Sequence, residues 1–143
     1  MLVIRREQME VFRRLAREQF ETQMSDHLRK FFPAQLAHLD DRQLSVCITR
    51  AIDRAAGYGL TTRRSCGHFL NLAATFGWDF DTREENAWIG DWLSNPELGP
   101  PASRLLHVAE RCKSLLRSGR MRPSSLENSP PVQPAEVDLS RRQ

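Results

Sequence analysis

The sequence predicts an all-α fold, a single compact bundle of about five to six helices followed by a disordered C-terminal tail. Apolar residues recur at steps of three and four along several stretches, as one face of a helix requires. Capping residues precede these stretches, and glycine or proline follows them. Because no sustained alternation of β-branched and aromatic residues occurs, we expect no strands.

The first predicted helix runs from Glu7 to Phe31 and would be roughly 36 Å long. Its apolar stripe contains Met9, Phe12, Ala16, Phe20, Met24, Leu28, Phe31 and the adjoining Phe32. Pro33 ends the helix, because proline has no backbone N–H and pushes the residue before it out of the α region. A short turn over 33–39 follows.

The second long helix is predicted to begin at Asp40, whose carboxylate can accept from the free amides of the first turn. Gln43 occupies the reciprocal position of a capping box. Gly57 and Gly59 are expected to supply left-handed positions that close this helix.

A third helix is predicted between a capping threonine, Thr61 or Thr62, and Gly77. Its buried face is expected to consist of Cys66, Phe69, Leu70, Ala73 and Phe76.

The stretch "GWDFDT" at 77–82 has two interpretations. Its carboxylates are hard oxygen ligands of the kind that bind Ca²⁺ or Mg²⁺, but the spacing lacks the later ligands of an EF-hand. As a structural corner, it would bury Trp78 and Phe80, satisfy the amides of the turn with Asp79 and cap the next helix with Asp81. We adopt the corner, with Thr82 as an alternative cap, and expect Asp81→Ala to cost about 0.5–2 kcal/mol.

Two further helices complete the predicted bundle. One carries Trp88, Ile89, Trp92 and Leu93; the last begins near Pro101 and is expected to bury Ala102, Leu105, Leu106, Ala109, Cys112 and Leu116. Trp88 and Trp92 are either core anchors or protein-binding residues, and an exposed aromatic patch would favour binding.

The chain is predicted to divide into a helical domain at 1–117 and a flexible tail at 118–143. The tail is rich in proline and serine and has too few apolar residues to offset the entropy of ordering. Its deletion is expected to leave the thermal midpoint unchanged. A segment at 135–139 that orders on a partner stays open as an alternative.

Charge and cysteine usage exclude several classes of protein. The net charge is only +3, with acids interspersed among the arginine pairs, so no nucleic-acid partner is expected. No run of about 20 apolar residues exists, so no membrane segment is expected. The odd number of cysteines, Cys47, Cys66 and Cys112, argues against a disulfide framework and favours the cytoplasm.

No metal, cofactor or catalytic site is predicted. Cys66 and His68 lie two apart on a helix and point to different sides, and no second ligand pair completes a zinc site. Phosphate-binding loops, nucleophile elbows and metalloprotease motifs are absent from the sequence. We therefore do not expect an enzyme.

Three segments, taken in order, resemble small helical proteins encoded beside effector and spike genes of bacterial type VI secretion systems. They are "LVIRREQ" with "MSDHLRKFFP", then "RAAGYGLTTRR", then "FGWDFDT". The resemblance covers about 1–116, leaves out the tail and carries over no site residues. Members commonly contain a Gly-x-Asp-Phe-Asp-Thr run, so the resemblance supports the corner interpretation.

The resemblance implies a non-enzymatic co-chaperone. Its partners would be an adaptor chaperone, a toxin effector or both, and it would help load the effector onto the spike. An immunity protein that neutralises a cognate toxin is the alternative, although this nearly balanced chain has no concentrated charge patch for one. The sequence does not determine the oligomeric state.

Overall fold

The computed structural model describes the backbone of residues 6–123, and side chains at residue 11 and from residue 13 onward. Within this part the fold is all-α, as predicted, and contains no strand. Its helices are α1 (Arg6–Phe31), α2 (Pro33–Leu36), α3 (Asp41–Gly57), α4 (Arg63–Phe76), α5 (Ala87–Leu93) and α6 (Pro101–Arg117), with 3-10 turns η1 (Glu84–Asn86) and η2 (Pro96–Leu98).

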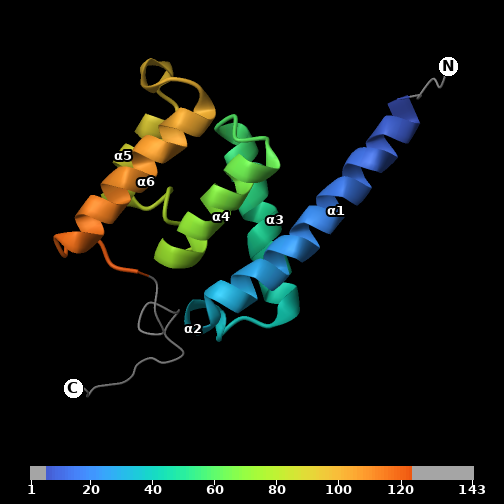
Figure 1. Cartoon of the computed structure of the whole chain (residues 1–143), viewed down its shortest axis with the longest axis horizontal. Helices are drawn as coiled ribbons and strands as arrows, with labels where there is room; N and C mark the ends of the chain where they lie inside the picture. Colours follow the sequence, from blue (N-terminus) through green and yellow to red (C-terminus); the bar gives the residue numbers. More distant parts are fainter. Residues whose placement is uncertain (1–5, 124–143) are drawn as a thin grey trace.

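The helices pack in a sequence of neighbouring pairs (Figure 1). α1 packs on α3, α3 packs on α4, α4 contacts α6, and α5 lies against α6. As a result, α1 and the α5–α6 pair lie on opposite sides of the central helices α3 and α4. The two sides of the domain therefore offer separate surfaces.

The core lies between these helices and is almost entirely apolar. Its largest fully buried side chains are Phe69, Phe80, Leu28, Leu36, Leu44, Ile48, Leu60, Leu70, Ile89, Leu93, Leu105 and Val108. Ser65 and Asp81 are the two buried polar or charged residues within the described chain.

Both capping boxes on the central helices are formed. At α3, Gln43 N–H donates to Asp40 Oδ1 at 2.7 Å, and the Gln43 side chain accepts from the Asp40 amide at 2.9 Å. At α4 the cap is Thr62, whose hydroxyl accepts from Ser65 N–H at 3.0 Å. The predicted closing role is confirmed for Gly59, with φ of 85°, whereas Gly57 remains helical.

The apolar stripe of α1 is buried only in its C-terminal half. Met24 and Leu28 are buried, but Ala16 is exposed and Phe31 is 59% exposed. The N-terminal part of α1 extends past the other helices, so nothing in the described chain covers that stretch (Figure 1). The side chains of Met9 and Phe12 lie outside the described part.

The buried face of α6 is rotated from the predicted one. Leu105 and Cys112 are buried as expected, together with Val108, which the prediction left out. Leu106 is 57% exposed and Leu116 is 37% exposed, which contradicts the prediction for both. Steps of three and four from Leu105 reach Val108 and Cys112, and this is the periodicity of one helix face.

The ordered domain continues past the predicted boundary at 117. After α6, Gly119 takes φ of 79°, and the amides of Arg120 and Met121 donate to the Leu115 carbonyl at 2.8 and 3.1 Å. This closing turn returns Met121 to the core, where it is only 9% exposed. The flexible tail predicted at 118–143 is therefore wrong for 118–121, and its part at 124–143 lies outside the described residues.

Truncation distinguishes the two boundaries. A chain that ends at Arg117 should be about 2 kcal/mol less stable than one that ends at Pro123, because it loses the buried Met121 side chain. Urea denaturation of both truncated chains measures the difference directly. Equal free energies of unfolding would show that the closing turn contributes nothing.

Candidate protein-binding surface

The corner at 77–82 joins α4 to the short helices η1 and α5. Gly77 ends α4 with φ of 117°, a backbone conformation that residues with a Cβ atom rarely adopt, so this position favours glycine. Phe80 is fully buried as predicted, whereas Trp78 is half-buried against the core. Asn86 Nδ2 donates to the Phe80 carbonyl at 3.0 Å and thereby ties η1 to the corner.

Asp81 is not a helix cap, contrary to the prediction. Its side chain is fully buried, and the turn that follows has Arg83 at its N-cap position without a side-chain capping bond. Arg54 of α3 donates to Asp81 Oδ1 from Nε at 3.2 Å and from Nη2 at 3.0 Å. The Tyr58 hydroxyl donates to Oδ2 at 2.9 Å, and Arg54 also donates to the Trp78 carbonyl. Asp81 therefore fastens the corner to α3.

Asp79 points away from this buried pair. Its carboxylate accepts from Arg83 Nε at 2.9 Å in an exposed ion pair four residues apart, rather than from amides of the turn as predicted. The turn itself is closed through the Asp79 backbone carbonyl, which accepts from the Thr82 amide and hydroxyl. Exposed pairs of this kind contribute little to stability.

Tyr58 gives the corner a measurable pH dependence. Burial and the hydrogen bond to Asp81 raise the pKa of Tyr58 from 10.0 to about 12, since both disfavour a phenolate. A pKa that is higher in the folded state stabilises the protein fully below pH 10. This contribution is lost as pH rises from 10 towards 12.

Ultraviolet titration checks this directly, because Tyr58 is the only tyrosine in the chain. We expect the tyrosinate absorbance to appear about two pH units later in folded protein than in urea-unfolded protein. The thermal midpoint should fall over the same alkaline range, and Tyr58→Phe should weaken that fall. Ionisation of the folded protein near pH 10 would contradict the buried hydrogen bond.

Trp88 and Trp92 lie one turn apart on α5 and face α6. Their rings meet edge to face, with centroids 5.0 Å apart and planes inclined at 74°. Both side chains are half-buried and pack on the core cluster while keeping part of their surface in water. Each ring therefore anchors α5 on the core and also keeps an accessible surface.

Arg111 completes this surface from α6. Its guanidinium carbon lies 5.3 Å from the ring centroid of Trp88 and 5.4 Å from that of Trp92, within the range of cation–π attraction. Arg111 is exposed, unlike Val108 and Cys112 on the same helix. We call Trp88, Trp92 and Arg111 the Trp–Arg surface. Tryptophan and arginine are the residue types most enriched among binding hot spots.

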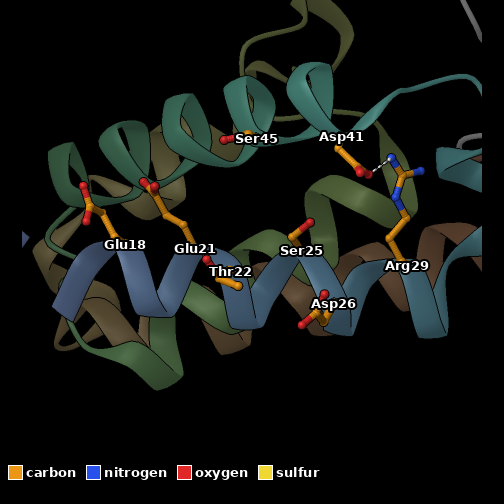
Figure 2. A pocket seen from close by; sticks show the side chains of 8 residues that line it. All are labelled: Glu18, Glu21, Thr22, Ser25, Asp26, Arg29, Asp41 and Ser45. Carbon is orange, nitrogen blue, oxygen red and sulfur yellow. Dashed lines mark hydrogen bonds and ion pairs between the residues drawn. The ribbon is translucent and has the colours of Figure 1, made fainter. Parts of the chain in front are cut away.

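A concave region lies between α1 and α3, away from the Trp–Arg surface (Figure 2). Its volume is about 410 Å³, and it is lined by Glu18, Glu21, Thr22, Ser25, Asp26, Arg29, Asp41 and Ser45. Figure 2 shows Arg29 and Asp41 meeting at one end, where Arg29 donates to Asp41 at 3.2 Å. Arg29 also donates to the carbonyls of Leu36 and Leu39. Its guanidinium therefore links α1 to α2 and to the turn that follows α2.

Two of the groove's carboxylates, Glu21 and Asp41, form contacts within the fold. Glu21 Oε2 accepts from Arg17 at 3.1 Å and from the Thr49 hydroxyl at 3.2 Å. Arg17 also reaches Asp53 at 2.7 Å, which links α1 to α3. The groove therefore carries the polar contacts between α1 and α3.

None of the three cysteines has the environment of a nucleophile. Burial raises the pKa of Cys47 and Cys66, and it raises the pKa of Cys112 to about 11. All three are free thiols, with Cys66 and Cys112 buried and Cys47 half-buried rather than in the core. A reactive cysteine instead needs a lowered pKa and access to solvent.

Metal sites and membrane-spanning helices are absent from residues 6–123. No group of three or more His, Cys, Asp and Glu side chains that could hold a metal ion occurs there, and exposed His68 is turned away from buried Cys66. No helix in residues 6–123 is both long enough and apolar enough to cross a membrane.

No family model, curated protein or solved structure matches this chain. The choice of the Trp–Arg surface as the candidate binding site therefore rests on the geometry of this chain alone.

Sequence reasoning named Trp88 and Trp92 but missed two residues that the structure places beside predicted ones. Arg54 and Arg111 both appear in the sequence as ordinary charged positions on helices. Arg54 follows the buried positions Ala51 and Ile52 on α3, and Arg111 adjoins buried Cys112 on α6. Their position at the edge of an apolar helix face was the only signal in the sequence that either arginine has a structural partner. The sequence does not identify those partners, because they lie on other segments of the chain.

Proposed function

We propose that this chain is a non-enzymatic, protein-binding accessory factor of the bacterial cytoplasm. It acts as a co-chaperone that helps an adaptor chaperone load a toxin effector onto the type VI secretion spike. The Trp–Arg surface is the observation that carries the binding role. The sequence resemblance to small type VI secretion proteins supplies the identity of the partners.

The geometry supports binding because the Trp–Arg surface is rigid and accessible at once. Trp88 and Trp92 are fixed by packing on the core and by their edge-to-face contact, so little entropy is lost when a partner covers them. The corner at 77–82 adds to this rigidity, because the buried Asp81 pairs with Arg54 and so fixes the segment that leads into α5.

Affinity capture with the tagged full-length chain in its native bacterium tests this function. We expect the adaptor chaperone to be recovered together with the effector, as identified by mass spectrometry. Trp88→Ala combined with Trp92→Ala should lower recovery by about 30-fold or more, because a hot-spot residue contributes at least about 2 kcal/mol.

The matched control is Phe31→Ala, which removes an exposed aromatic ring at the C-terminal end of α1. This variant should capture the same partners as the wild type, and circular dichroism should show that every variant is helical. Recovery of the toxin alone, in a complex that blocks its activity, would identify an immunity protein and overturn the co-chaperone role. Undiminished capture by the double tryptophan variant would overturn the binding role of this surface.

A further inference from the structure

The Trp–Arg surface contains an arginine that donates no hydrogen bond within residues 6–123. Three arginines lie over aromatic rings in the described chain: Arg54 over Phe69, Arg63 over Phe20, and Arg111 over the two tryptophans. The first donates to Asp81, and the second donates to Gln23. Arg111 forms no ion pair and donates no hydrogen bond to any residue that the structure describes.

The two rings hold the guanidinium in place while its edge stays in water. A guanidinium has five N–H donors in one plane, and contact with an aromatic face leaves those donors available. The arrangement at Arg111 is thus prepared for a planar acceptor with two oxygens, and a carboxylate satisfies this requirement through a bidentate pair.

The charges on α6 favour an anion. α6 contains Arg104, Arg111, Lys113 and Arg117 against a single acidic residue, Glu110, which lies 3.6 Å from Lys113. The one opposing charge on α5 is the exposed Asp91. The neighbouring turns η1 and η2 add the acidic residues Glu84, Glu85 and Glu97. The complementarity to an acidic ligand therefore lies on α6 itself, whereas the groove between α1 and α3 is lined by acids.

We propose that the Trp–Arg surface recognises an acidic segment of its partner protein, in which an Asp or Glu side chain neighbours an aliphatic residue. The carboxylate pairs with Arg111, and the aliphatic side chain lies on the exposed parts of Trp88 and Trp92. This inference deepens the proposed function and rests on it, because it specifies the partner chemistry for the same surface.

The first test titrates ¹⁵N-labelled full-length protein with the acidic peptide EELLEE and with its uncharged counterpart QQLLQQ. We expect EELLEE to shift the indole N–H signals of Trp88 and Trp92 and the Arg111 Nε–H signal, while the Trp78 indole signal stays in place. QQLLQQ should bind at least about tenfold more weakly, because it cannot form the charge-assisted bidentate pair. Equal binding of the two peptides, or no shift with either, would overturn the proposal.

Two substitutions of Arg111 separate the contribution of its planar, bidentate guanidinium from that of its positive charge. Arg111→Gln should weaken EELLEE binding by about tenfold, and Arg111→Lys should restore only part of it, because lysine keeps the charge without the planar fork. Arg111 is exposed, so both variants should retain wild-type thermal midpoints. Full binding by either variant would contradict the carboxylate pair.

The captured partner distinguishes this inference from the proposed function. A partner that requires Trp88 and Trp92 but binds the Arg111→Gln variant as well as the wild type would overturn the inference and leave the protein-binding function standing. Loss of that partner with Arg111→Gln, and partial recovery with Arg111→Lys, would support both.

Discussion

Replacing Asp81 with alanine is expected to lower the free energy of unfolding by about 3–5 kcal/mol, because the change leaves the Arg54 charge without its partner inside the protein. The Asp81 side chain is fully buried, and that of Arg54 is 28% exposed. The variant also removes the acceptor of the Tyr58 hydroxyl. This loss exceeds the 0.5–2 kcal/mol expected of a helix cap, so urea denaturation separates the two roles.

Asp79→Ala is the matched control, since it removes a carboxylate two residues away whose pair with Arg83 is exposed. It should change the free energy of unfolding by at most about 1 kcal/mol. Equal losses for the two aspartates would contradict the buried role of Asp81.

A double variant tests whether the cost arises from an unpaired charge. Arg54→Met combined with Asp81→Leu removes both charges and should be more stable than Asp81→Ala alone, because apolar replacement of a buried pair is often neutral. A double variant less stable than the single one would show that the contribution of the pair lies mainly in packing and the Trp78 carbonyl contact.

Phe80→Ala is the second change with a large expected effect, a loss of about 3–5 kcal/mol. The ring is fully buried, and its centroid lies 5.2 Å from that of Phe69 at an interplanar angle of 52°. Truncation would leave a cavity between the corner and α4 that the rigid surroundings cannot fill.

Phe31→Ala provides the comparison for the same chemical change at an exposed position. Because Phe31 is 59% exposed, we expect its truncation to alter the free energy of unfolding by no more than about 0.5 kcal/mol. Thermal and urea unfolding of both variants measure the contrast. A loss at Phe80 as small as that at Phe31 would show that the corner is not part of the core.

The helix ends could be predicted from the sequence because their signals are local. Asp40 and Gln43 lie three residues apart, as do Thr62 and Ser65, and each pair forms its capping box without help from the rest of the chain. Gly77 likewise ends α4 through its own backbone conformation. Such signals need no knowledge of how the helices pack.

The contacts between helices could not be predicted in the same way. Arg54 and Asp81 are 27 residues apart, and their pairing depends on how α4 and the corner pack on α3. Arg111 reaches Trp88 and Trp92 only because α5 lies against α6. Periodicity identified the helices and many of their buried residues, but it did not determine which charged residue at the edge of a buried face meets a partner.

In α1 and α6, the periodic apolar residues extend further than the buried face of the helix does. The stripe of α1 continues in the sequence to Ala16 and beyond, but this end of the helix passes outside the bundle (Figure 1). Leu106 and Leu116 likewise follow the composition of a core face while pointing to solvent. An apolar pattern reports which residues favour burial, and the length of the neighbouring helices decides which of them are covered.

Hydrogen–deuterium exchange of the full-length chain, alone and bound to the partner that it captures, tests the central claim most directly. Binding through the Trp–Arg surface predicts new protection in α5 and in the Leu105–Arg117 part of α6, with α1 unchanged. Protection confined to α1 and the groove that it forms with α3 would place the binding surface on the opposite side of the domain and contradict the account.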